Sequence, residues 1–364
     1  MQKIGILTFH RCINYGSYWQ ARCLVEGLQA LGKDVKLLNH TSRKTDRAEW
    51  RCALQPLRPA PTRKSDYPLY AAKMRRFLEA IGDLPLSQCF DLENPSDMEG
   101  YDLVIVGSDE VWNLRHPWYG RTPLFYGEGL RARNVAAYAA SFGNQPASQA
   151  LEHTWAEKLQ KFSRISIRDE NSRRLISQAL SFEPDLVLDP CLQFPAVVGY
   201  SVSCSRSAAE CLNDVPENSY IAVYGHSFPD WFSQKVRRWA TARGERLISI
   251  GYRNDWADRH FIEAGPEEFA RFMAAADAVV TNFFHGCIFA LLNGKPFACV
   301  ASEYRSNKLR GLTELVGARK HLVHEDAPDA RFAEVLESRL EPAVLSRIQA
   351  LRQQSHAYLA DVIN

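Results

Sequence analysis

Lys3-Ile-Gly-Ile-Leu-Thr-Phe-His-Arg-Cys-Ile-Asn-Tyr-Gly-Ser17 is the stretch that decides the fold. Residues 3–9 are mostly apolar and predict a buried strand, and the polar residues 10–15 predict the turn that follows it. Apolar residues then recur at helical spacing up to Gly32, a typical helix stop. A second strand is predicted over 34–39. Strand, turn, helix, strand is the opening of a doubly wound α/β domain.

The same alternation continues along the chain. Further strands are predicted over residues 103–107, 135–140, 165–167, 186–188, 220–224, 246–250, 278–281 and 297–300. Helices are predicted over residues 149–162, 170–180, 231–242, 266–276, 285–292 and 305–316. At 364 residues the chain exceeds the size at which a single core stops growing. The expected fold is therefore α/β, with two Rossmann-like domains facing a cleft in a GT-B-like layout.

The expected domain boundaries follow from this pattern. Residues 1–192 are expected to form an N-terminal Rossmann-like domain, and residues 193–342 a C-terminal one. A last helix within 343–364 is expected to pack back on the N-terminal domain. Prolines break the pattern between 41 and 97, where we expect a basic insertion of loops and short helices in the first domain.

Composition excludes several classes of protein. The net charge of +2 argues against a general nucleic-acid binder, which normally carries a strong basic excess. No apolar run approaches the ~18 residues of a membrane span, and the N-terminus lacks a signal-peptide core. We therefore expect a cytoplasmic protein. The nine cysteines are scattered without a Cys-x-x-Cys, so we expect neither disulfides nor a metal site.

Polar motifs follow most of the predicted strands. They are Asn14-Tyr-Gly16, Gly107-Ser-Asp-Glu-Val-Trp112, Ser166-Ile-Arg-Asp169, Leu188-Asp-Pro190, Phe284-His-Gly286 and Arg305-Ser-Asn-Lys308. In this order the motifs resemble those of the polysaccharide pyruvyl transferase family. The resemblance implies a GT-B-like fold and transfer of a pyruvyl group from phosphoenolpyruvate to a sugar, usually as a ketal, with no further cofactor. Asn282, Phe283 and Cys287 replace Asp, Ser and Thr of many members, so contacts to the acceptor there are expected to differ.

His285 is the predicted general acid and base. Ketal formation requires a proton on the methylene carbon of phosphoenolpyruvate, and only histidine titrates near pH 7 without perturbation. His285 directly follows the predicted strand 278–281, where ligands of such sheets bind. A helix cap or a packed core histidine is the alternative interpretation.

Cations and a helix start are predicted to bind the anionic donor. Arg168 follows the predicted strand 165–167, and the adjacent Asp169 is expected to fix the orientation of its guanidinium. A guanidinium can donate two parallel hydrogen bonds to a carboxylate or a phosphate. A surface ion pair with Asp169 or Glu170 is the alternative. By family position Ser306 binds phosphoenolpyruvate, with Arg305 and Lys308 as helpers at a helix N-terminus.

In the arrangement that the resemblance implies, residues 1–192 lie on the acceptor side and residues 193–342 on the donor side. Five residues that follow the first and third predicted strands are candidates for contacts to the acceptor. Asn14, Tyr15, Ser108 and Trp112 are predicted to contact the sugar, and Asp109 to bind hydroxyls or act as a base. A packed turn for Asn14 and Tyr15, and helix capping by Asp109, are equally compatible with the sequence.

The basic insertion suggests a further partner. Between residues 43 and 76 there are ten Lys or Arg against three acids, interleaved with aromatic residues. We expect either a solvated face or peripheral contact with an anionic membrane.

Two other functions remain open. One is a GT-B nucleotide-sugar glycosyltransferase, because the fold is shared. The other is a catalytically inactive family member that binds glycans. The expected partners are phosphoenolpyruvate and a sugar or lipid-linked oligosaccharide. No nucleic acid is expected to bind.

Overall fold

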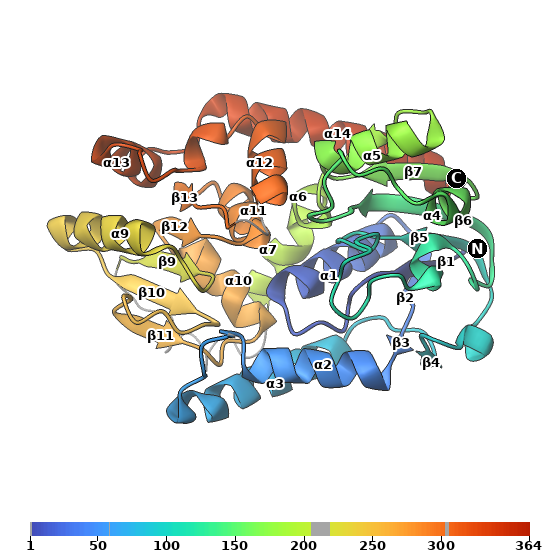
Figure 1. The fold of residues 1–364 in the computed structure, drawn as a ribbon, viewed down its shortest axis with the longest axis horizontal. Helices are drawn as coiled ribbons and strands as arrows, with labels where there is room; N and C mark the ends of the chain where they lie inside the picture. Colours follow the sequence, from blue (N-terminus) through green and yellow to red (C-terminus); the bar gives the residue numbers. More distant parts are fainter. Residues whose placement is uncertain (1, 58, 205–218, 303–305) are drawn as a thin grey trace. The chain divides into compact units, whose positions relative to one another are not determined.

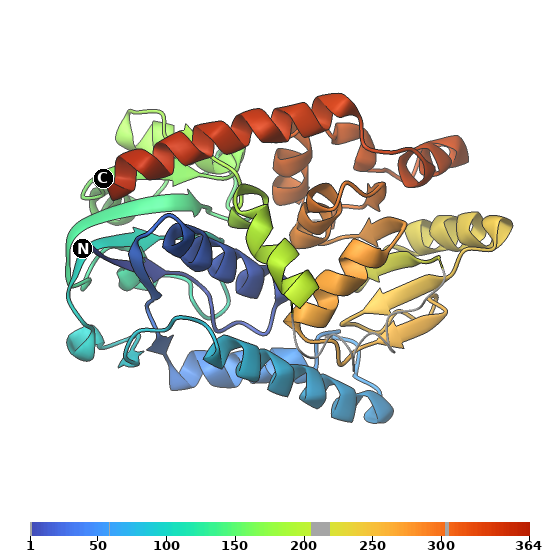
Figure 2. The same cartoon turned by 180° about the vertical axis from the view of Figure 1, so that it is seen from behind.

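A computed structural model describes residues 2–57, 59–204, 219–302 and 306–364. The chain divides into two compact units, each an α/β assembly (Figures 1 and 2). Unit 1 comprises Met1–Glu49, Ile81–Val197 and Ile348–Asn364, and unit 2 comprises Trp50–Ala80 and Val198–Arg347.

Unit 1 is built on a six-stranded parallel sheet with the order β2-β1-β5-β6-β7-β8. Its strands are β1 (Lys3–Leu7), β2 (Asp34–Leu37), β5 (Tyr101–Val106), β6 (Ala132–Ala140), β7 (Arg164–Ile167) and β8 (Asp185–Leu186), with a small pair β3 (His40–Thr41) and β4 (Phe90–Asp91). Its helices are α1 (Tyr15–Ala30), α4 (His153–Leu159), α5 (Glu170–Leu180) and α6 (Pro190–Gln193). The strand order runs outward from β1 in both directions, which is the doubly wound topology predicted from the first 39 residues.

Unit 2 repeats this design with a five-stranded parallel sheet in the order β11-β10-β9-β12-β13. The strands are β9 (Ile221–Tyr224), β10 (Leu247–Ile250), β11 (Arg259–Phe261), β12 (Ala278–Thr281) and β13 (Phe297–Cys299). The helices are α9 (Asp230–Arg243), α10 (Pro266–Ala275), α11 (Phe284–Leu292), α12 (Ser306–Leu315) and α13 (Asp329–Glu337). Because β9, β12 and β13 are adjacent and parallel, the segments that follow them emerge at one edge.

Four of the described helices contain residues of both units: α2 (Arg43–Leu54), α3 (Tyr67–Gly82), α7 (Pro195–Cys204) and α14 (Pro342–Ile363). The region 41–97 was expected to hold loops and short helices, and that expectation was wrong for α2 and α3. The prolines of this region lie outside the two helices or in the first turn of α3, where proline is tolerated.

The expected placement of the insertion in the first domain also differs from the contacts, which assign Trp50–Ala80 to unit 2. Within unit 2, the buried carboxylate of Asp66 pairs with the guanidinium of Arg253, at 2.7 Å to Nη2. The ammonium of Lys73 donates to the carbonyl of Gly251 at 3.0 Å and lies 4.2 Å from the ring centre of Tyr252. Lys73 of the insertion therefore has a structural role, as does Arg253. Their contacts hold residues 66–73 against the segment that follows β10.

The last helix, α14 (Pro342–Ile363), contributes Ile348–Asn364 to unit 1. Ser355 accepts from the backbone N–H of Leu188 at 2.9 Å, and the Tyr358 hydroxyl donates to the carbonyl of Ala137 at 2.7 Å. Among the described residues, no helix is both long and apolar enough to cross a bilayer. All the described cysteines with placed side chains are free thiols.

Candidate active site

In unit 2, His285 occupies the place that the sequence predicted for it. Strand β12 ends at Thr281, and His285 is the second residue of α11, with only 8% of its surface exposed. Its ring lies 5.2 Å from that of Phe284. The side chain therefore stands at the carboxyl edge of the unit 2 sheet, where ligands of such sheets bind.

The Phe-His-Gly motif has a local physical reason. The Thr281 hydroxyl donates to the carbonyl of Tyr224 at 2.6 Å and accepts from the backbone N–H of Phe283 at 3.0 Å. A Cβ on Gly286 would lie 2.0 Å from this hydroxyl oxygen. Only glycine allows so close an approach of α11 to the end of β12. Gly286 and Thr281 together therefore fix the helix turn that carries His285.

An aromatic cluster that the sequence motifs did not indicate lies on the same edge. The rings of His226, Tyr252 and Phe283 lie 5.0–5.4 Å apart, and the Asn282 amide donates to the carbonyl of His226 at 2.8 Å. His226 and Tyr252 lie just after β9 and β10, so the strand-end argument that was applied to His285 could have identified them. Lys73, held over Tyr252, belongs to this cluster and had no local signal in the sequence.

The predicted donor-binding helix start is α12, which begins at Ser306 with Lys308 in its first turn. Both side chains are half-buried. The first N–H groups of a helix and a nearby ammonium favour an anion. Arg305, the third predicted residue here, lies outside the described residues.

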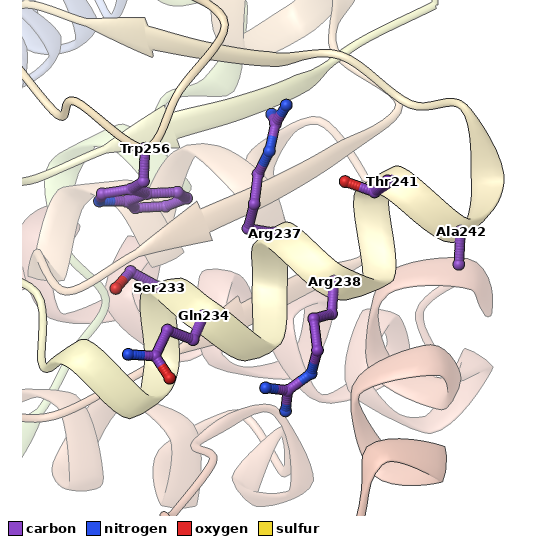
Figure 3. Close-up of a pocket in the computed structure, with 7 residues that line it drawn as sticks. All are labelled: Ser233, Gln234, Arg237, Arg238, Thr241, Ala242 and Trp256. Atoms are coloured by element: carbon purple, nitrogen blue, oxygen red, sulfur yellow. The ribbon is translucent and has the colours of Figure 1, made fainter.

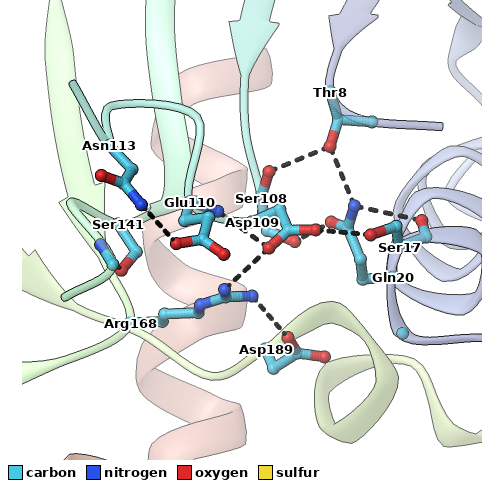
Figure 4. Close-up of polar contacts among 12 residues, drawn as sticks. Thr8, Ser17, Gln20, Ser108, Asp109, Glu110, Asn113, Ser141, Arg168 and Asp189 are labelled. Carbon is cyan, nitrogen blue, oxygen red and sulfur yellow. Dashed lines mark hydrogen bonds and ion pairs between the residues drawn. The ribbon is translucent and has the colours of Figure 1, made fainter. Parts of the chain in front are cut away.

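In unit 1, the guanidinium of Arg168 lies in a buried ion-pair network (Figure 4). Its Nη2 donates to Asp109 Oδ1 at 3.0 Å and its Nη1 to Asp189 Oδ2 at 3.2 Å. Burial alone would lower the pKa of Arg168, but the charges of Asp109 and Asp189 outweigh it and raise the pKa above its ordinary value.

The prediction that Asp169 fixes Arg168 was wrong. The Asp169 carboxylate caps α5 by accepting from the N–H of Ser172 at 2.7 Å, and it accepts from the Ser141 hydroxyl at 2.7 Å. The alternative of a surface ion pair is also wrong, because the Arg168 side chain is only 3% exposed.

Asp109 is the most constrained of the predicted residues. Its φ of 81° lies in the left-handed region, which non-glycine residues rarely adopt. Its carboxylate accepts from Arg168, from the Ser17 hydroxyl at 2.8 Å and from the N–H of Glu110 at 2.8 Å (Figure 4). No α-helix starts at Asp109, so the capping alternative is wrong. Strained residues held by many contacts concentrate at functional sites.

The four other acceptor candidates are held by structural contacts. Asn14 caps α1 by accepting from the N–H groups of Gly16 and Ser17, and Tyr15 is fully buried. The Ser108 hydroxyl bonds the Gln20 side chain. Trp112 is 0% exposed and donates to the carbonyl of Phe125 at 2.9 Å. Trp112 is therefore a core residue, and no sugar can stack on its ring in this structure.

Unit 2 also has a hollow of about 670 Å³ along α9 that contains none of the predicted site residues (Figure 3). It is lined by Ser233, Gln234, Arg237, Arg238, Thr241, Ala242 and Trp256.

Two solved structures of similar fold are those of UDP-GlcNAc 2-epimerases. The UDP-GlcNAc 2-epimerase of Methanocaldococcus jannaschii, in complex with UDP-GlcNAc and UDP, has a TM-score of 0.55 at 13% identity, covering 98% of this chain and 100% of that one. The UDP-GlcNAc 2-epimerase of Neisseria meningitidis bound to UDP-GlcNAc has a TM-score of 0.51 at 10% identity, covering 98% and 94%. These likenesses confirm a GT-B-like fold with two Rossmann-like units and, at such identity, show the fold alone.

Comparison with curated proteins finds no match. The family described as polysaccharide pyruvyl transferase matches residues 14–304, a range that contains Asp109, Arg168 and His285. The match covers most of the 364 residues and confirms the resemblance inferred from the strand-end motifs. The chain belongs to the polysaccharide pyruvyl transferase family.

Proposed function

We propose that this protein transfers the pyruvyl group of phosphoenolpyruvate to a sugar of a polysaccharide or lipid-linked glycan precursor, as a ketal, and releases phosphate. The observation that supports this most directly is the family match over residues 14–304, with His285 held at a strand end by Thr281 and Gly286. The acceptor, by its family, is a glycan.

The proposed reaction uses His285 as the acid. His285 delivers a proton to the methylene carbon of phosphoenolpyruvate, which leaves an oxocarbenium-like centre at C2. One sugar hydroxyl attacks C2 and loses its proton, the phosphate leaves, and a second hydroxyl closes the ketal. The two hydroxyl protons balance the one on the methyl group and the one released with phosphate.

Three parts of the protein bind the charges or hydroxyls of the substrates in the proposed reaction. The first turn of α12, with Ser306 and Lys308, offers N–H groups and a cation to the donor phosphate. Arg168 presents a guanidinium to the donor carboxylate. Asp109 accepts hydrogen bonds from acceptor hydroxyls and takes up a proton as they attack.

The test is phosphate release from phosphoenolpyruvate across a panel of sugar acceptors. We expect release with at least one acceptor, and thermal stabilisation by phosphoenolpyruvate but not by UDP-GlcNAc. Stabilisation by UDP-GlcNAc without phosphate release would favour the glycosyltransferase alternative. Glycan binding with neither result would favour an inactive family member.

We also propose that the protein works in the cytoplasm and touches an anionic membrane through α2. Arg43, Lys44, Arg47 and Arg51 are exposed and form no ion pair with the described residues, and Trp50 is 47% exposed on the same helix. Cations around an exposed tryptophan suit a surface of acidic lipid headgroups.

Liposome sedimentation tests the membrane proposal. We expect binding to acidic but not neutral vesicles, fading as salt is added. Arg47→Glu and Trp50→Ala should weaken binding, while Arg133→Glu, at an 85% exposed side chain on β6, should not. Equal sedimentation with neutral and acidic liposomes would refute this proposal.

A further inference from the structure

Asp189 is a buried carboxylate that the sequence motifs left without a role. Its side chain is 1% exposed, and it belongs to the Leu188-Asp-Pro190 motif that follows β8. It forms an ion pair with Arg168, at 3.2 Å. Burying a carboxylate so completely costs free energy unless the carboxylate is paired, and Arg168 supplies that pairing.

The contacts of Asp189 show how it controls Arg168. One carboxylate oxygen, Oδ1, accepts from the N–H of Cys191 at 3.1 Å at the start of α6, which fixes the carboxylate to the backbone. The other oxygen, Oδ2, accepts from Arg168 Nη1. Because Asp109 binds Nη2, both ends of the guanidinium fork are held, and its plane cannot rotate.

We infer that Asp189 is a positioning residue, which holds the Arg168 guanidinium in the orientation that pairs it with Asp109. This inference rests on the proposed transfer from phosphoenolpyruvate. Asp189 touches neither substrate in this account and acts through Arg168.

The negative charge of Asp189 distinguishes a positioning role from a role in binding the donor. Asp109, Arg168 and Asp189 together carry a formal charge of −1, from two carboxylates and one guanidinium. The charge of Asp189 therefore weakens the attraction of Arg168 for an anionic donor. Removing that charge should leave donor affinity unchanged or higher. Turnover should fall, because a guanidinium that can rotate no longer holds Asp109 in place. A misplacement of about 1 Å near the reacting atoms can lower the rate about 10²-fold.

The experiment compares Asp189→Asn with wild type and with the matched control Asp185→Asn. Asp185 pairs with Arg164 at 3.6 Å in the same unit, but its side chain is 46% exposed. Calorimetry measures the Kd of phosphoenolpyruvate, phosphate release measures kcat, and thermal melting checks the fold. For Asp189→Asn we expect kcat to fall about tenfold or more and donor Kd to stay equal or fall. Asp185→Asn should match wild type.

Unchanged kcat in Asp189→Asn would overturn the inference, as would a loss of kcat and donor affinity together. If that variant melts below the assay temperature, Arg168→Lys decides. A lysine keeps the charge but contacts one carboxylate at a time, so we expect kcat to fall while donor Kd changes little. Arg168→Lys with wild-type kcat would overturn the inference. No turnover in wild type would refute the proposed function and this inference with it, whereas wild-type turnover shared by Asp189→Asn would refute the inference alone.

Discussion

Replacing His285 by alanine is the sharpest test of the proposed chemistry. If His285 supplies the proton, its loss removes about 10² to 10⁴ in kcat, equivalent to about 3 to 5 kcal/mol of transition-state stabilisation. The fold should survive, because the turn that carries it is held by backbone bonds to the Thr281 hydroxyl and to the carbonyl of Phe283. A buried side chain is lost nonetheless, so the free energy of unfolding should fall by about 1 to 2 kcal/mol.

The assay measures kcat by phosphate release and donor Kd by calorimetry on the same preparation of His285→Ala. Donor Kd should change far less than kcat, since the α12 terminus and Arg168 are untouched. His324→Ala, at an exposed histidine of unit 2, is the control and should behave as wild type. A folded His285→Ala protein with near-normal kcat would show that the histidine is structural, and Asp109 would become the leading proton donor.

Three further predictions concern stability and are measured by denaturant unfolding. Gly286→Ala should cost about 1 to 3 kcal/mol, because the new Cβ would lie 2.0 Å from the Thr281 hydroxyl; an unchanged midpoint would refute this packing argument. Asp66→Ala should cost about 3 kcal/mol, because it removes the buried carboxylate that binds the Arg253 guanidinium at two of its nitrogens and leaves only the 3.9 Å pair with the exposed Asp255. Burial alone would raise the pKa of Asp66, but Arg253 lowers it, so the difference from wild type should shrink only as the pH falls below about 4. Burial lowers the pKa of His40 to about 4, so His40 should contribute a fall in stability of about 2 kcal/mol from pH 7 to pH 5. His40→Gln should lose that contribution, while the buried His10, whose pKa is also lowered by burial, keeps its own.

The sequence predicted those elements whose periodicity is local and strong. The strand over 278–281 and the helix over 170–180 were predicted at the bounds that β12 and α5 have. Elements stabilised by contacts from elsewhere were missed. Helix α3 follows a proline-rich segment, and it is tied to unit 2 by Asp66 and Lys73, whose partners lie more than 170 residues away. Strand β11 has only three residues, too few to show alternation.

The same limit applies to the predicted site residues. The strand-end rule placed His285 correctly because its position depends on one strand and the glycine after it. The same rule, applied to Tyr15 and Trp112, selected residues that the structure buries. A motif near a strand end specifies the edge at which a side chain emerges, but not whether it faces a ligand or the core. For aromatic residues, whose burial is strongly favourable, the core is the commoner outcome.

Arg168 shows where reasoning from neighbours in sequence fails. The adjacent Asp169 was the obvious partner, yet a residue that begins a helix directs its carboxylate to the helix N–H groups, and Asp169 does so. The carboxylates that bind Arg168 lie 59 and 21 residues away, and they meet because β5, β7 and β8 end at one edge of the sheet. The topology that makes a doubly wound sheet bind ligands at its carboxyl edge also gathers charged residues there. Which of those charges neutralise one another, and which remain for a substrate, depends on distances that only the folded chain establishes.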